Sequence, residues 1–186
     1  MVSWTDTTPD ERARGTLQYH WSRWGSWKPS DWMLEFAVIS DGVVVGTQGI
    51  GSRDFAVLCE VHTGSWLGRR YQGQGIGTQM RAAVLHLAFE GLGARHAVSA
   101  AFEDNAPSLG VSRKLGYRDD GIEWHVVRGR PALTRFAQPP ERRAGHHGPG
   151  RVCSAHSAGS GLPGRGRGGQ GSKTSFPRTW PPRLMR

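Results

Sequence analysis

With 186 residues, the chain is long enough for one folded domain and a tail, and its formal net charge of +9 is unevenly distributed. Residues 137–186 hold nine Lys or Arg against one acidic residue, a net +8, which leaves +1 for residues 1–136. The basic excess therefore belongs to the end of the chain. The two cysteines lack the spacing of a zinc site, so no metal is expected. No apolar signal segment or membrane span stands out, which predicts a cytoplasmic protein without membrane contact.

A helix is predicted over residues 8–24. Thr8 suits the N-cap position, and Glu11, three residues later, completes a capping box. Apolar residues then recur at helical spacing and are predicted to contact the core: Leu17, Trp21 and Trp24. The alternative is that Trp21, Trp24 and Trp27 form one wall of a substrate site.

Three strands follow as an antiparallel meander. The first is predicted over residues 32–40 and the second over residues 43–48, joined by the hairpin turn signal Asp41-Gly42. Glycines at residues 49 and 51 are interpreted as the end of the second strand. The third strand is predicted over residues 60–67, and it leads into a glycine-rich loop.

The glycine-rich loop stands between this third strand and a helix predicted over residues 78–92. It comprises Gln72, Gly73, Gln74, Gly75, Ile76, Gly77 and Thr78. Glycines at such a junction let the backbone turn tightly and let a ligand approach closely. The helix behind them adds unpaired N–H donors and a partial positive charge. The loop is therefore predicted to cradle an anion, and a pyrophosphate suits it. The alternative is a glycine-rich helix start with no ligand.

The loop does not match two common phosphate-binding motifs. A P-loop needs a lysine after its last glycine, and the loop contains none. A dinucleotide fingerprint has the spacing GxGxxG, and here the third glycine, Gly77, comes one residue early. The ligand class is therefore left to the motifs further along the chain.

The second half of the domain is predicted as a strand, a helix and a hairpin. The strand covers residues 97–102, the helix runs from its N-cap Asn105 through Lys114, and the hairpin pairs residues 122–127 with 132–136. From residue 137 the pattern stops, and 17 of the last 50 residues are Gly or Pro. Such a segment cannot bury enough apolar surface to offset its ordering entropy, so a disordered tail is predicted.

The tail admits two interpretations. Its run GRGRGG, residues 164–169, is similar to the RGG segments that bind RNA, which indicates weak, non-specific contact with nucleic acid. The abrupt change of composition is also what a shifted reading frame in a GC-rich gene would produce.

Four motifs in order resemble the GNAT N-acetyltransferase superfamily, and within it the branch of the ribosomal-protein N-terminal acetyltransferases. The spacing Gln72-x-x-Gly75-x-Gly77 resembles the acetyl-coenzyme-A loop of that family. Before it stands GSWL, residues 64–67; after it come NAPS, residues 105–108, and RKLGY, residues 113–117. Each is similar to the motif that the branch carries at the same place.

This resemblance implies an α+β fold with three layers, α/β/α, in which helices flank a mixed, mostly antiparallel sheet. The domain would cover residues 1–136 and the tail residues 137–186. The family's first strand and first helix have no counterpart here, and its last strand continues past the position of Phe136. The chain is therefore expected to be a GNAT domain clipped at both ends.

The resemblance also implies a reaction. An amine would attack the thioester of acetyl-coenzyme A directly in a ternary complex, and the acceptor would be a peptide N-terminus or a small molecule. The alternative is an inactive fragment whose basic tail binds nucleic acid.

The matched motifs assign the coenzyme contacts. The loop of residues 72–78 would hold the pyrophosphate, while the strand end with Trp66 and Leu67, together with Asn105, would hold the pantetheine arm. Ser108 would protonate the departing thiolate. Asn105 fits equally well as a helix cap. Many family members have a catalytic tyrosine where Ser112 stands.

The general base is expected on the third strand. His62 and Glu60 are two residues apart, so both side chains face the same side of the sheet. The related branch often has a carboxylate where His62 stands, and an imidazole with an ordinary pKa of about 6.5 suits deprotonation of an ammonium. The alternative is that His62 donates to a backbone carbonyl in a packed strand and that Glu60 is a solvated charge.

Overall fold

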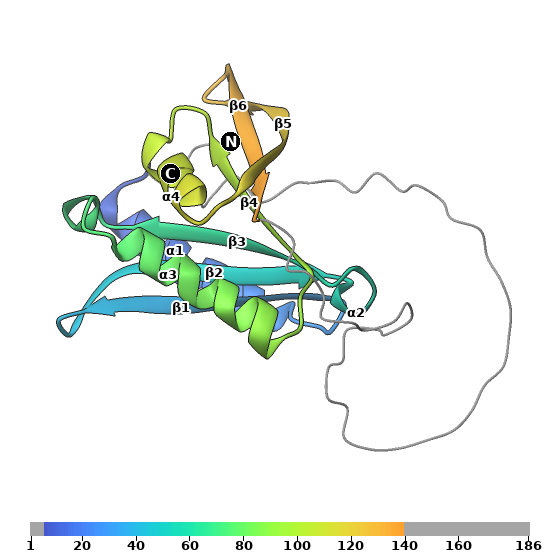
Figure 1. Cartoon of the computed structure of the whole chain (residues 1–186). Coiled ribbons are helices and arrows are strands. Elements are labelled where there is room, and N and C mark those ends of the chain that lie inside the picture. The colour runs from blue at the N-terminus through green and yellow to red at the C-terminus, as the bar shows by residue number, and fades with distance from the viewer. Residues whose placement is uncertain (1–5, 140–186) are drawn as a thin grey trace, which may run out of the picture.

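The structure is a computed structural model that describes residues 6–139 (Figure 1). Its elements in chain order are α1 (Pro9–Gly25), β1 (Asp31–Ser40), β2 (Val43–Arg53), α2 (Phe55–Leu58), β3 (Glu60–Leu67), the 3-10 turn η2 (Arg69–Tyr71), α3 (Ile76–His86), the π-helical turn η3 (Leu87–Gly91), β4 (His96–Phe102), α4 (Ala106–Lys114), β5 (Arg118–Val127) and β6 (Arg130–Gln138). Nearly all of the predicted tail lies outside the described residues, so its disorder and its contact with nucleic acid stay predictions. No helix of the described part is long and apolar enough to cross a membrane.

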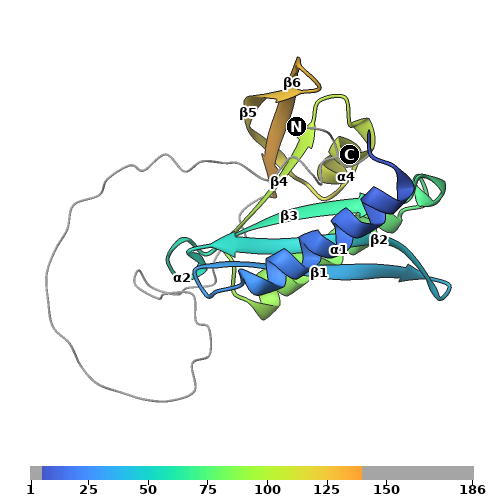
Figure 2. The same ribbon diagram turned by 180° about the vertical axis from the view of Figure 1, so that it is seen from behind.

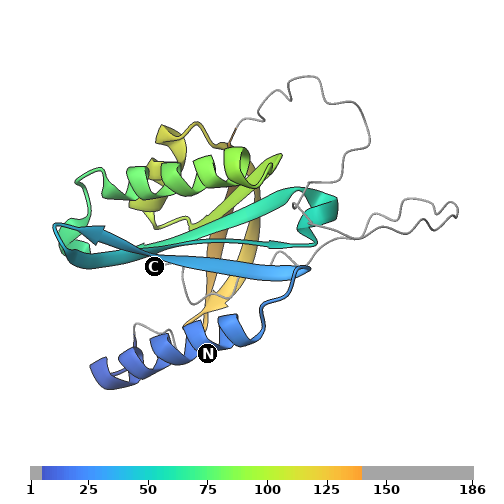
Figure 3. The ribbon, with the colours of Figure 1, turned by 90° about the horizontal axis from the view of Figure 1, so that it is seen from below.

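The six strands form one mixed sheet in the order β1-β2-β3-β4-β6-β5. Only β3 and β4 run parallel, and every other neighbouring pair is antiparallel. Helix α1 lies on one face of the sheet, while α3 and α4 lie on the other (Figures 2 and 3). The predicted three-layer α+β architecture is therefore confirmed.

The parallel strands β3 and β4 separate after a short contact. They pair over four residue pairs, from Glu60 opposite His96 to Thr63 opposite Ser99. Beyond that point β3 remains paired with β2, and β4 pairs with β6. Figure 1 shows β4 leaving β3 as it runs toward α4. The second half of β3 therefore has no strand partner on its β4 side.

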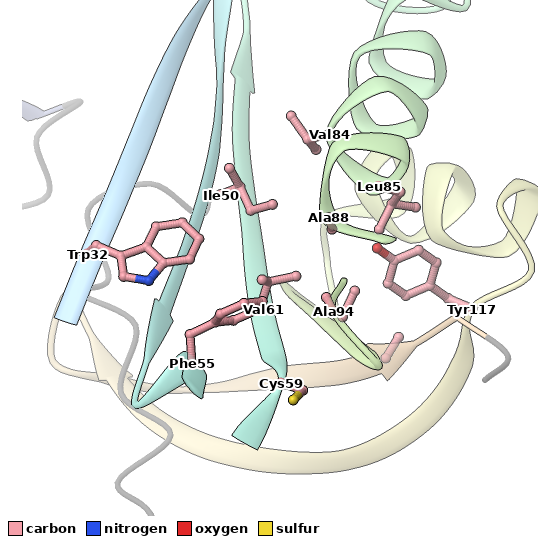
Figure 4. Close-up of a cluster of buried hydrophobic side chains, with 12 residues drawn as sticks. Trp32, Ile50, Phe55, Cys59, Val61, Val84, Leu85, Ala88, Ala94 and Tyr117 are labelled. Atoms are coloured by element: carbon pink, nitrogen blue, oxygen red, sulfur yellow. The ribbon is translucent and has the colours of Figure 1, made fainter. Parts of the chain in front are cut away.

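The main core lies between the sheet and α3 (Figure 4). Ile50 on β2 and Val61 on β3 are fully buried, and they share one core cluster with Val84 and Leu85 of α3 and Ala88 of η3. Burying a side chain of the size of Val, Leu or Ile contributes about 1.5–3 kcal/mol. This packing fixes α3, and with it the glycine loop, against β3.

Strand β2 is longer than predicted, because it continues through Gly49 and Gly51 to Arg53. The interpretation of these glycines as a strand end was wrong. A Cβ at Gly49 would lie 2.9 Å from the Glu35 carboxylate, and a Cβ at Gly51 would lie 2.8 Å from the Trp32 carbonyl oxygen. Glycine is needed in the strand because neighbouring groups cross over it.

Strand β5 also begins earlier than predicted, and β6 ends later. The prediction begins this strand at residue 122, whereas β5 begins at Arg118 and contains a shift of register between Asp119 and Gly121, where Gly121 has a φ of +123°. Strand β6 continues two residues beyond Phe136, and its last residue, Gln138, donates a side-chain hydrogen bond to Asp120.

Helix α1 begins as predicted, because the capping box between Thr8 and Glu11 is present. The predicted core contact was wrong. The exposed fractions of the three residues are 53%, 60% and 70% for Leu17, Trp21 and Trp24. The contact with the sheet is made by another residue, Tyr19, whose hydroxyl lies 3.4 Å from the Glu35 carboxylate and 3.5 Å from the Met33 sulfur.

The carboxyl group of Glu35 has an unusually high pKa. Burial raises its pKa to about 7, although the hydrogen bond from Tyr19 and the charge of Arg23 lower it. The ordinary value is 4.5, so the folded state holds the proton more tightly than the unfolded state does. Ionisation of Glu35 therefore opposes folding. Its protonated form stabilises the fold fully below about pH 4.5, and this contribution is lost as the pH rises through about 7.

We therefore expect Glu35→Gln, which cannot ionise, to raise the free energy of unfolding at about pH 8 by up to about 3 kcal/mol. At about pH 4 the variant and the wild type should be equally stable. Urea denaturation at both pH values measures this difference. Asp104→Asn, at an exposed position, is the matched control. An equal effect of Glu35→Gln at both pH values would contradict the assignment.

Candidate active site

A cleft of about 1350 Å³ passes through the opening between β3 and β4. On the α1 side of the sheet it is lined by residues of α1, β1, β2 and β3. On the other side it is lined by the glycine loop, α3 and α4. A molecule bound in the cleft can therefore be approached from both faces of the sheet.

Nearly all of the predicted site residues line this cleft. Those that do are Glu60, His62, Trp66, Leu67, Gln72, Gly73, Gly75, Gly77, Thr78, Asn105 and Ser108. Two predicted loop residues, Gln74 and Ile76, are not among the lining residues. The structure thus brings the base candidates of β3, the loop and the start of α4 around one cavity.

The glycine loop is shaped by backbone conformation. Gly73 and Gly75 have φ angles of +77° and +85°, in the left-handed region that side chains disfavour. The loop is braced from within, because Gln72 donates to the carbonyl of Leu67 at 3.0 Å and Gln74 donates to that of Arg70 at 2.9 Å. The two glutamines therefore support the loop with their side chains.

The start of α3 fits an anionic ligand. Gly75 is its N-cap residue, so no side chain satisfies the first N–H groups of the helix. No atom lies within 4 Å of a Cβ added at Gly73 or Gly75, which leaves open space beside the backbone. Exposed Arg69 and Lys114 line the same cleft. Helix N–H groups, a positive helix end and two cations are the donors that a pyrophosphate requires.

The β4-facing edge of β3 fits the rest of coenzyme A. Beyond Thr63 the backbone groups of residues 64–67 on this edge have no β4 partner, and these residues line the cleft. Backbone N–H and C=O groups along the edge of an extended strand suit the two amides of a pantetheine arm. The loop and this edge together would hold acetyl-coenzyme A, which supplies the acetyl group as an activated thioester.

Helix α4 presents the acid candidate. Asn105 is its N-cap, and its side-chain oxygen accepts a hydrogen bond from the backbone N–H of Ser108 at 3.2 Å. The interpretation of Asn105 as a helix cap is therefore confirmed, and Asn105 also lines the cleft. Ser108, one turn further on, is half-buried there, while Ser112 is buried.

An unpredicted residue, Arg81 of α3, joins these serines. Its side chain is only 3% exposed and lines the cleft. The guanidinium donates to Ser112 at 2.9 Å, to Ser108 at 3.3 Å and to Ser65 of β3 at 3.5 Å. The sequence carried one signal, because Arg81 precedes the buried Val84 and Leu85 by three and four residues and so shares their helix face.

The base candidates lie on the opposite face of the sheet. Val61 packs against α3, so His62 and Glu60, which alternate with it, face the α1 side. Burial and, to a smaller extent, the charge of Arg53 lower the pKa of His62 to about 4, while Asp31 opposes this shift. The ordinary pKa of about 6.5 assumed from the sequence is therefore too high. His62 is neutral at neutral pH.

The alternative role proposed for the tryptophans of α1 and the following turn is not seen. Trp21, Trp24 and Trp27 are not among the residues that line the cleft. Helix α1 contributes Tyr19 and two arginines instead, Arg12 and Arg23. The acceptor side of the cleft is therefore more polar than the tryptophan pattern indicated.

Solved structures share this fold. Ribosomal-protein-S5-alanine acetyltransferase of Vibrio fischeri is 18% identical with a TM-score of 0.56, covering 70% of this chain and 71% of that chain. Spermidine N-acetyltransferase of Vibrio cholerae is 11% identical with a TM-score of 0.54, covering 72% of this chain and 75% of that chain. RimJ of Mycobacterium smegmatis, in complex with CoA-disulfide, is 24% identical with a TM-score of 0.52, covering 70% of this chain and 60% of that chain.

The sequence comparison reaches the same family. Residues 1–118, well over half of the chain, match the family model described as the acetyltransferase (GNAT) domain. The match includes β3, the glycine loop, α3 and α4, which build the coenzyme side of the cleft. The predicted resemblance is thereby confirmed, and the chain belongs to the GNAT family of acetyltransferases.

Proposed function

We propose that this protein transfers the acetyl group of acetyl-coenzyme A to a primary amine, on a peptide N-terminus or a small molecule, in the cytoplasm. The observation that carries the proposal is the two-sided cleft in the opening between β3 and β4. A coenzyme held by the loop of residues 72–78 on one face leaves the other face for the acceptor.

On the coenzyme side of the cleft, the chain binds and orients acetyl-coenzyme A. The N–H groups at the start of α3 hold the pyrophosphate, and the edge of β3 aligns the pantetheine arm so that the thioester lies in the opening. Ser108 stands on α4 at the same opening, where a hydroxyl can give a proton to the departing sulfur.

On the acceptor side His62 takes up a proton. Its pKa of about 4 makes it a weak base, but it is unprotonated at every physiological pH. Formation of the bond between nitrogen and the acetyl carbon makes the N–H proton far more acidic, and a weak base can then accept it. Glu60 lies on the same face two residues away and lines the cleft, so it is the second candidate.

A negative charge introduced in the first turn of α3 tests whether coenzyme A binds there. Thr78→Glu places a carboxylate in the first turn of α3, inside the cleft, where it repels a pyrophosphate. We expect affinity for coenzyme A to fall about tenfold or more, measured by titration calorimetry. The stability of α3 should not fall, because an acidic residue in the first turn interacts favourably with the positive end of the helix.

The neighbouring residue supplies the matched control. Gln79→Glu adds the same charge one residue later, on an exposed side chain outside the cleft lining, and should leave coenzyme affinity within about twofold. Equal losses in both variants would mean that the charge acts on the helix generally. Unchanged affinity in Thr78→Glu would place the anion elsewhere.

The base assignment predicts a particular pH profile. His62→Gln should lower kcat by about a hundredfold or more at every pH from about 6 to 9, because His62 is unprotonated over this whole range. Any acidic limb of kcat/KM in this range should be the same in wild type and variant, since it reports the acceptor ammonium, whose pKa is about 8 for a peptide N-terminus.

The same measurements include the controls. Coenzyme affinity should not change in His62→Gln, and Glu60→Gln tests the second candidate. A limb near pH 6.5 that disappears with His62 would contradict the lowered pKa. Normal rates in both variants would remove the base from β3.

A further inference from the structure

Arg81 is a buried charge without a counter-charge. Removing a guanidinium from water is unfavourable unless its charge is paired. In the described part of the chain no carboxylate lies within ion-pair distance of Arg81, and its hydrogen-bond partners there are three neutral hydroxyls. Its Nε, also buried, has no partner there. Burial lowers the pKa of Arg81, but a guanidinium remains protonated. This positive charge therefore lies deep in the cleft wall.

The hydroxyls around Arg81 are not equivalent. Ser112 accepts from Arg81 at 2.9 Å and donates its own proton to the backbone carbonyl of Ser108 at 3.3 Å. The Ser108 hydroxyl accepts from Arg81 at 3.3 Å, and among the described residues it donates to none. Ser108 also lines the cleft. Its O–H, like that of Ser65, which also lines the cleft, is therefore left to donate to a ligand, with the charge of Arg81 directly behind it.

We propose that Arg81 is a positioning residue for the chemical step, a role that rests on the proposed acetyl transfer. It holds the Ser108 hydroxyl toward the departing sulfur, and its charge stabilises the negative charge that develops there. The acceptor nitrogen bonds to the acetyl carbon, the C–S bond breaks, and its electron pair goes to sulfur. Ser108 gives its proton to the sulfur while Arg81 stabilises the serine oxygen. Water returns a proton to Ser108, and the proton released by the amine replaces the one that water has given up.

A purely structural role is the competing explanation, because Arg81 links α3 to α4 and β3. A readout is therefore needed that structure alone would not move. The thiol of bound coenzyme A provides one, since a cation within about 4–6 Å lowers the pKa of an acidic group by about 1–3 units. Thiolate formation is followed by ultraviolet absorbance as the pH is raised, at coenzyme concentrations that saturate each protein.

We expect the thiol pKa of bound coenzyme A to be at least about one unit lower in wild type than in Arg81→Met. Arg81→Gln is the second variant, because it keeps a donor for Ser112 while it removes the charge, and it should behave like Arg81→Met. Ser112→Ala is the matched control. It breaks the shortest hydrogen bond of the cluster but leaves the charge in place, so its thiol pKa should equal that of wild type.

A double-mutant cycle tests the link to Ser108. Arg81→Gln and Ser108→Ala should each lower kcat by about tenfold or more, and the double variant should lose little beyond either single one. Circular dichroism and thermal melts of each variant report whether the fold is retained.

The possible outcomes separate the two proposals. If wild type does not bind coenzyme A, the proposed function fails and the role of Arg81 fails with it. If wild type binds, and the thiol pKa is the same in wild type and in Arg81→Gln, only the role of Arg81 is overturned. Additive losses in Arg81→Gln and Ser108→Ala would also overturn it, because the two residues would then act independently.

Discussion

The parallel pairing of β3 with β4 ends at Thr63 and Ser99, and the rest of the site depends on that end point. A backbone edge without a strand partner is costly in a protein interior, because its N–H and C=O groups need hydrogen bonds. Here the edge faces a cleft, where a ligand with amide groups can form these hydrogen bonds. The same separation lets residues of the two sheet faces meet. His62 lines the cleft on the α1 side, and Ser108 lines it on the α4 side.

Local signals predicted most of the fold. The capping box at Thr8, the Asp41-Gly42 turn and the glycines at the start of α3 each need a particular backbone geometry, so the residue types reveal the structure. At Gly49 the residue type suggested the wrong structure. It was interpreted as a strand end, yet it lies within β2 because the Glu35 carboxylate crosses over it. That requirement comes from a neighbouring strand, and the local sequence does not contain it.

The remaining errors concern burial by distant parts of the chain. Helical spacing shows that Trp21 and Trp24 share a face of α1, but not which face is covered. Arg81 falls on a buried face, although arginine is a residue type rarely buried. The lowered pKa of His62 likewise depends on burial within the sheet and on Arg53 of the adjacent strand. The motifs indicated residues that line one cleft, whereas the electrostatics of the cleft needed the three-dimensional structure.

The short contact between β3 and β4 also limits how firmly the two halves of the sheet are joined. Four parallel residue pairs join the half of the sheet with β1, β2 and β3 to the half with β4, β5 and β6. A coenzyme seated along β3 and against α4 would act as a missing strand, because it bonds to both halves at once. Its binding energy would add directly to the cohesion of the fold, by about 2.7 kcal/mol at a hundred times its Kd. The substrate would thus be a structural member of the sheet during each catalytic cycle.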